Sequence, residues 1–270
     1  MSKREVYPNA LIVLVAIEIR HPTHGPLDRS QVLQLSTLIR EVLPLPDEVT
    51  MVTVELQAGP DRQPTQRQTV MSVPRWTTRD KRTALTIRGD GLVIETSRYH
   101  SYEQMRKLLD LALRARTAVS APAGVERIGL RYIDEIRVPV DKTQGEPAWQ
   151  EWVDPSLLGP VHIGADLGLT AAGGEGLAVF SGDGDKALVL RYGVQDDYAV
   201  QSTPQLRRPL PPPGPLFKLD IDSYWQPGNE VPEFTVDSIL DCADELHEPV
   251  NGVFESLISD RLREEVLRRG

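Results

Sequence analysis

The chain has 270 residues and a formal net charge of −9, so we do not expect a broad nucleic-acid-binding surface, which would need a basic footprint. Hydrophobic residues make up 40%, enough for a substantial core, and the length suits one large domain or two small ones. A single cysteine, Cys242, excludes an internal disulfide and a cysteine-based zinc site, and it fits a reducing compartment.

The N-terminal apolar run over residues 10–17 bears on localisation. It is shorter than the roughly 20 residues of a membrane span, and it passes directly into Glu18 and Arg20. It also lacks the small-residue cleavage site of a secretory signal. The sequence therefore predicts a cytoplasmic, soluble protein that does not associate with a membrane.

The first half of the chain predicts mainly strands, with two helices. Residues 9–20 are nearly continuously hydrophobic, which predicts a strand buried on both faces. A helix should follow a cap at Asp28 or Ser30 and end before Pro44, and a second helix should begin after Ser101. Further strands are predicted over residues 49–56, 69–76, 82–88 and 92–97, with a polar loop over residues 59–68.

The second half predicts more strands and a long terminal helix. Predicted strands cover residues 125–139, 177–180, 187–194 and 217–225, and a short helix is expected around Trp149. The proline tract over residues 207–215 is interpreted as an extended linker, with recognition by a partner as the alternative. Residues 236–269 are predicted to be helical, kinked or divided near Pro249 and Gly252.

This order of elements predicts an α+β fold with a largely antiparallel sheet, packed helices and a long C-terminal helix. The halves 1–140 and 141–270 each run through strands into a helix. This similarity suggests an internal duplication of a strand–helix–strands unit within one compact structure.

Two predicted strands carry opposite charges on their polar faces. Arg127 and Arg131 alternate with apolar residues in one strand, and Asp220 and Asp222 do so in the other. If the strands are neighbours, the carboxylates can meet the guanidinium groups. The favoured interpretation is a charge ladder that fixes the register of the strands. The alternative is a cleft in which the arginines bind a carboxylate or phosphate through paired hydrogen bonds.

His247 is a further candidate because it precedes a predicted helix break and has an ordinary pKa near neutrality. His21 and His24 lack the convergent partners of a zinc site, and residues 173–176 lack the features of a phosphate-binding loop. No metal or cofactor is therefore predicted. The candidate ligand-binding residues are Arg127, Arg131, Tyr132, Asp220, Asp222 and His247.

Three segments resemble a sporadically distributed bacterial protein family of unknown function. They are GLRYI at residues 129–133, DIDSYW at residues 220–225 and LHEPVNGVFESLISD at residues 246–260. The resemblance implies a single-unit architecture and an accessory role in bacteria. It brings no established activity, so it supplies no catalytic residues.

These patterns favour a non-catalytic binding or accessory protein that recognises a protein partner or a small anionic ligand on the sheet surface. The alternative is an enzyme whose cleft combines arginine, aspartate and His247. A familiar nucleophile motif and a phosphate-binding loop are both missing from the sequence, which favours the first hypothesis without excluding an unfamiliar active site.

Overall fold

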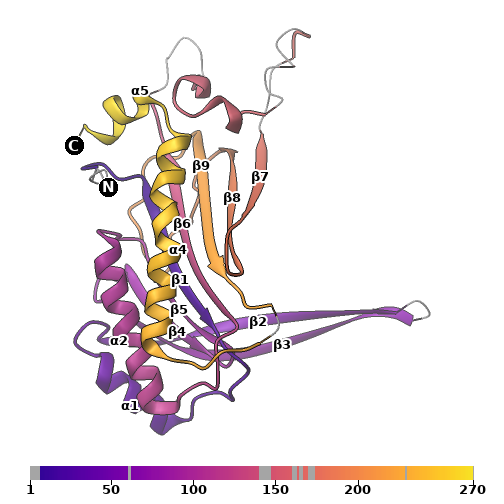
Figure 1. Ribbon diagram of the computed structural model, residues 1–270, viewed down its shortest axis with the longest axis vertical. Coiled ribbons are helices and arrows are strands. Elements are labelled where there is room, and N and C mark those ends of the chain that lie inside the picture. The colour runs from indigo at the N-terminus through magenta and orange to yellow at the C-terminus, as the bar shows by residue number, and fades with distance from the viewer. Residues whose placement is uncertain are drawn as a thin grey trace.

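The computed structural model describes residues 7–59, 62–139, 147–159, 163, 167–169, 174–228 and 230–269, and for residues 52–69 it describes the backbone only. The protein is an α+β structure in which helices pack on one face of a nine-stranded antiparallel sheet (Figure 1), as predicted. The first half contains β1 (Ile12–Arg20), α1 (Arg29–Ile39), β2 (Leu45–Gly59), β3 (Arg62–Thr77), β4 (Thr83–Arg88), β5 (Gly91–Thr96) and α2 (Tyr102–Ser120). The second half contains β6 (Arg127–Ile136), the 3-10 turns η1 (Trp149–Glu151) and η2 (Pro155–Leu157), β7 (Glu175–Ser181), β8 (Lys186–Gln195), β9 (Leu216–Trp225), α4 (Val236–Leu257), α5 (Asp260–Leu262) and η3 (Arg263–Leu267).

The sheet joins both halves of the chain in the order β2-β3-β4-β5-β1-β6-β9-β8-β7. β1 and β6 lie side by side in its middle. β1 pairs with β5, the strand before α2, and β6 pairs with β9, the strand before α4. The remaining hairpins extend outward on both sides. This repeated order is what an internal duplication would produce, although the duplication itself stays a prediction.

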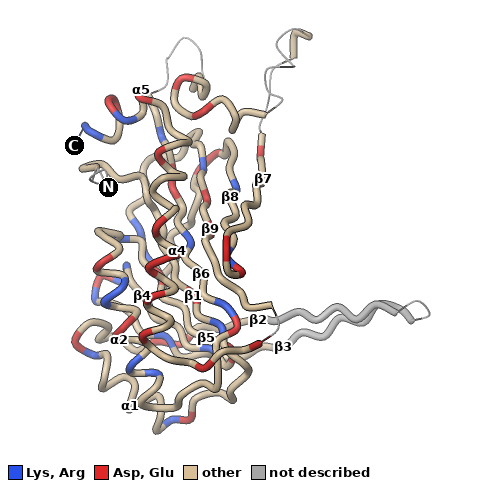
Figure 2. The backbone as a smooth tube through the Cα atoms, in the orientation of Figure 1, with Lys and Arg blue, Asp and Glu red and all other residues tan. Residues whose placement is uncertain are grey.

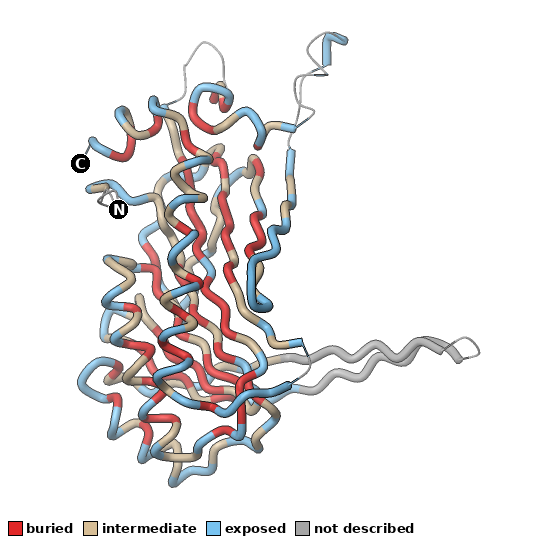
Figure 3. The backbone as a smooth tube through the Cα atoms, in the orientation of Figure 1, coloured by how far each residue is buried: buried red, intermediate tan, exposed pale blue. Residues whose placement is uncertain are grey.

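The core lies between the sheet and the helices. Along β1, Val15, Ile17 and Ile19 are fully buried, whereas Leu14, Ala16 and Glu18 between them are half-buried. Figure 3 shows the buried residues gathered where the sheet lies against α2 and α4. The prediction that this strand is buried on both faces is therefore wrong, because α1, α2 and α4 cover only one face. We call the other face the open face.

The long helix α4 does not break where the sequence predicts. It continues through Pro249 to Leu257, and the chain turns extended at Ile258, which forms a bridge with Val153. Ser259 then caps α5 by accepting a hydrogen bond from the Leu262 N–H, at 3.1 Å. The bridge between Val153 and Ile258 thus ends the helix about nine residues after Pro249, where local propensity predicts the break. Among the described residues, no helix is long and apolar enough to cross a membrane.

The predicted loop over residues 59–68 is mostly strand. The ladder between β2 and β3 continues to Gly59 and Arg62, with residues 60 and 61 outside the description. β3 pairs with β4 only over its last three residues, so the two strands project from the body as a long hairpin (Figure 1). A two-stranded ribbon tolerates Pro64 because not every backbone N–H of an edge strand needs a partner.

The proline tract belongs to a strap, residues 196–215, that connects β8 to β9 across the open face. The backbone N–H of Arg207 donates to the Lys81 carbonyl, at 2.7 Å, which fixes the strap to the β3–β4 turn. Arg208 is buried and donates to Glu135 of β6, at 2.8 Å. The tract is therefore held against the sheet rather than being a free linker.

Candidate functional site

The two charged strands are neighbours, as predicted. β6 and β9 pair antiparallel, with Arg131 directly opposite Asp222. Arg131 donates two hydrogen bonds to Asp220, at 2.7 and 2.6 Å. The Asp220 side chain is only 1% exposed, whereas that of Arg131 is 46% exposed, so the guanidinium covers a buried carboxylate.

Arg127 continues this network along the open face. Its guanidinium donates to Asp222, at 3.0 and 3.2 Å, and to Glu18 of β1, at 2.9 Å. It also lies over the ring of Tyr224, 4.7 Å from the centroid. Glu18 in turn accepts a hydrogen bond from Arg88 of β4, at 2.7 Å. This is the charge ladder that the sequence favours, and an anion would have to displace carboxylates to reach its arginines.

Opposing effects act on the pKa of Glu18 within the ladder. Burial alone would raise it, but the hydrogen bond from Arg88 and the positive charges of Arg88 and Arg20 outweigh burial and lower it. The carboxylate therefore stays ionised at neutral pH. An ionised Glu18 keeps the ladder paired across β1, β4 and β6.

The ladder makes a quantitative prediction. Arg131→Ala should lower the free energy of unfolding by about 2–3 kcal/mol, because it leaves the buried carboxylate of Asp220 unpaired. The double variant Arg131→Ala/Asp220→Ala should lose less than the sum of the single variants, with a coupling of about 1–3 kcal/mol in urea denaturation. Additive losses within about 0.5 kcal/mol would contradict this interpretation.

The six candidate residues do not share one cleft. Tyr132 follows Arg131 in β6, and neighbouring residues of a strand point to opposite faces. Tyr132 is buried on the helix-covered face, where its hydroxyl lies 3.0 Å from Nδ1 of His247 on α4. A single cleft that combines arginine, aspartate and His247 is therefore not formed. The sheet separates the charge ladder from the pair Tyr132–His247.

Tyr132 and His247 instead line a cavity of about 510 Å³ between α4, the start of α2, the central strands and the segment before β1. We call it the tyrosine pocket and define it by six of its lining residues: Tyr99, Tyr102, Tyr132, Asp134, His247 and Phe254.

Four rings of this pocket form a continuous wall. Tyr99 meets Tyr132 edge to face, with centroids 5.8 Å apart. His247 stacks on Tyr102, with centroids 3.9 Å apart and an interplanar angle of 14°. Together with the contact between Tyr132 and His247, these contacts fix the ring positions before any ligand arrives.

Asp244 of α4 holds the aromatic wall in place through hydrogen bonds. The hydroxyl of Tyr102 donates to Asp244, at 2.8 Å, and Nε of Arg106 donates to both carboxylate oxygens, at 2.8 and 2.9 Å. Burial and the bond to Asp244 raise the pKa of Tyr102 far above its ordinary value. Tyr102 therefore stays neutral at any physiological pH.

Asp134 of β6 is the unusual member of the pocket. It is 3% exposed and lines the cavity, and no hydrogen-bond or ion-pair partner among the described residues meets its carboxyl group. Burial raises the pKa of Asp134 to about 7. Buried polar groups normally have partners, so a carboxyl group left open toward a cavity calls for an explanation.

Asp134 is absent from the residues that the sequence predicts for the site, although the sequence carries a signal for it. Ile128, Leu130, Tyr132 and Ile136 alternate along the apolar face of β6, and Asp134 occupies the position on this face between Tyr132 and Ile136. A carboxyl group in an otherwise apolar register is rarely buried without a partner or a function. The interruption of the apolar pattern could therefore have identified the residue.

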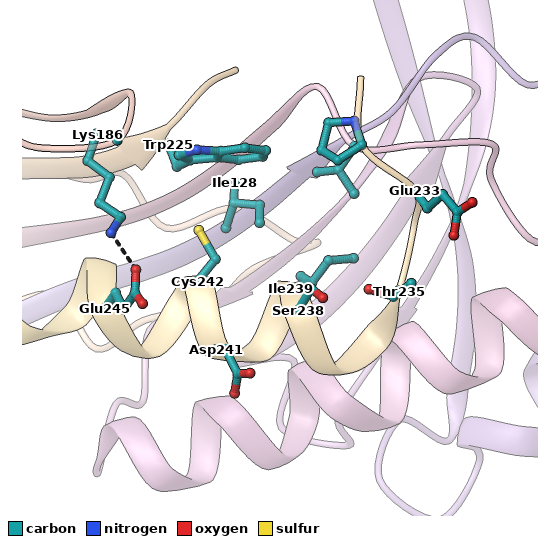
Figure 4. A pocket seen from close by; sticks show the side chains of 13 residues that line it. Ile128, Lys186, Trp225, Glu233, Thr235, Ser238, Ile239, Asp241, Cys242 and Glu245 are labelled. Atoms are coloured by element: carbon teal, nitrogen blue, oxygen red, sulfur yellow. Dashed lines mark hydrogen bonds and ion pairs between the residues drawn. The ribbon is translucent and has the colours of Figure 1, made fainter. Parts of the chain in front are cut away.

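A second cavity, of about 590 Å³, lies beside the N-terminal half of α4 (Figure 4). Cys242 points into it, and Lys186 forms an ion pair with Glu245 at its edge. Burial raises the pKa of the Cys242 thiol to about 11, so the reactive thiolate is scarce at neutral pH. Cys242 is therefore not activated as a nucleophile, and the tyrosine pocket is the stronger candidate.

No group of three or more histidine, cysteine or acidic side chains within the described part of the chain is arranged to hold a metal ion. The chain matches no protein-family model and no curated protein. The resemblance to a bacterial family of unknown function therefore stays a prediction.

Proposed function

We propose that this protein is a non-catalytic binding protein that takes a small organic molecule into the tyrosine pocket. The observation that carries the proposal is a cavity of about 510 Å³ with an aromatic wall and further apolar lining from Leu11, Val250 and Leu267. Ligand sites of proteins are typically concave, mostly apolar and about 300–1,000 Å³ in volume.

Preorganisation supports the same proposal. The hydroxyl of Tyr102 is bonded to Asp244, and the hydroxyl of Tyr132 meets His247, so these rings lose little further freedom when a ligand binds. A pocket whose side chains are already held in place binds more tightly than one that must be ordered by its ligand. The wall therefore suits recognition of a flat or apolar group.

The expectation of an anionic ligand on the sheet surface has less support, because Arg127 and Arg131 are already paired with carboxylates. A protein partner on that surface stays a prediction. An enzyme remains the second candidate, now at the tyrosine pocket, because the raised pKa of Asp134 lies near neutrality, where a general acid or base is most effective.

Three fragments with one ring and different charges test the proposal: benzylamine, benzyl alcohol and benzoate. Saturation-transfer NMR should detect binding of at least one of them to the wild type. Asn251→Trp places a bulky ring among the lining residues and should abolish that signal. Ser256→Trp, on the exposed side of the same helix, should keep it. Failure of all three fragments to bind the wild type, or equal binding to Asn251→Trp and Ser256→Trp, would overturn the proposal. Conversion of a bound fragment would favour the enzyme.

A further inference from the structure

We infer that the ligand of the tyrosine pocket carries a single positive charge, an organic ammonium group whose charged end meets Asp134 and whose apolar part lies against the tyrosine rings. This inference rests on the proposed function and names the chemical class of the ligand.

The open carboxyl group of Asp134 is the first argument. Its burial without a partner among the described residues is unfavourable, and the penalty grows when the group ionises. A cation that enters the cavity supplies the missing partner and favours the ionised form. A buried charge is tolerated when it is paired with an opposite charge and hydrogen-bonded. An ammonium group provides both the charge and the hydrogen-bond donors.

The aromatic wall is the second argument. The faces of tyrosine rings carry partial negative charge and attract a cation within about 6 Å of the ring centroid. Tyr99, Tyr102 and Tyr132 all line the same cavity as Asp134. A carboxylate combined with several tyrosine rings is the combination of groups that recognises an organic ammonium ion rather than a neutral molecule.

The charge of the surroundings is the third argument. No lysine or arginine is found among the described residues that line the pocket, and Asp134 is their only carboxyl group. Helix α4, which forms one wall, carries six acidic residues and no lysine or arginine (Figure 2). Several of these acids pair with neighbouring arginines or with Lys186, but the whole chain keeps a net charge of −9. The negative electrostatic potential of these charges attracts cations and repels anions.

Isothermal titration of the same three fragments at pH 7.5 tests the inference. Wild-type protein should bind benzylamine, which is protonated at this pH, at least about ten-fold more tightly than benzyl alcohol and should bind benzoate least. A ten-fold preference is a modest expectation for one buried ion pair. Asp134→Asn should remove the preference. Asp241→Asn removes one charge from α4 outside the pocket and should retain it.

The outcomes separate the inference from the proposed function. Preferential binding of benzyl alcohol or benzoate, or an unchanged preference in Asp134→Asn, would overturn the cationic ligand while leaving a binding pocket in place. Binding of none of the fragments would overturn both. Circular dichroism of Asp134→Asn and Asp241→Asn should match that of the wild type, so that a lost preference cannot arise from unfolding.

Discussion

Asp134→Asn should stabilise the protein at pH 8 by about 2–4 kcal/mol, an unusual direction for a substitution in the core. The folded protein holds the Asp134 proton up to about pH 7, whereas an unfolded chain loses it near the ordinary value of 3.8. The folded state therefore binds this proton more tightly than the unfolded chain does. The bound proton stabilises the folded state fully below pH 3.8, and this contribution is lost as the pH rises through about 7. Asparagine is never charged, so it avoids this loss, although its amide also stays buried.

Urea denaturation at pH 5 and pH 8 measures this effect. The wild type should lose more stability than Asp134→Asn between the two values. His100 and His247 also line the pocket, but they are present in both proteins, so the difference isolates Asp134. Asp241→Asn should follow the wild type. Equal pH dependence of the wild type and Asp134→Asn would contradict the prediction.

Glu135→Ala should destabilise the protein by about 3–5 kcal/mol, the largest loss expected for a single charged residue here. Glu135 is buried at the end of β6 and accepts hydrogen bonds from Arg208 and Arg137, at 2.8 Å each, and from the backbone N–H of Ala199, at 3.0 Å. Arg208 is 3% exposed, so its guanidinium would remain buried without its carboxylate. The substitution should also release the strap from the sheet.

The matched control is Glu126→Ala, at an exposed position just before β6. It should change the free energy of unfolding by no more than about 0.5 kcal/mol. Faster proteolysis between residues 196 and 215 in Glu135→Ala alone would locate the loss at the strap. A loss below about 1 kcal/mol would mean that water or another group replaces Glu135, contrary to the expected result.

The pairing of β6 with β9 could be predicted because its signals are local. Each strand alternates apolar and charged residues, and the charges of Arg131 and Asp220 are complementary. The fold class followed from the order of such segments along the chain. The open face could not be predicted, because it depends on which side of the sheet α1, α2 and α4 occupy, and that choice is made by distant contacts.

The candidate site was predicted only in part. Tyr132 and His247 are both among the predicted ligand-binding residues and lie in contact, but the prediction groups them with Arg131, although strand alternation alone places Tyr132 and Arg131 on opposite faces. Asp134 is absent from the prediction because that prediction depends on the charges of the polar face, and Asp134 lies on the apolar face. The uninterrupted helix at Pro249 shows the same limit, since packing of α4 along the sheet overrides the local preference for a break.

The carboxyl group of Asp134 can be observed directly by carbon-13 NMR, with its resonance assigned by its loss in Asp134→Asn. The group should titrate with a midpoint near pH 7 in the empty protein. Saturating benzylamine should lower that midpoint by at least about one unit, because a bound cation favours the carboxylate. A midpoint near 4 in the empty protein, unchanged by benzylamine, would mean that Asp134 is neither desolvated nor the partner of a cation.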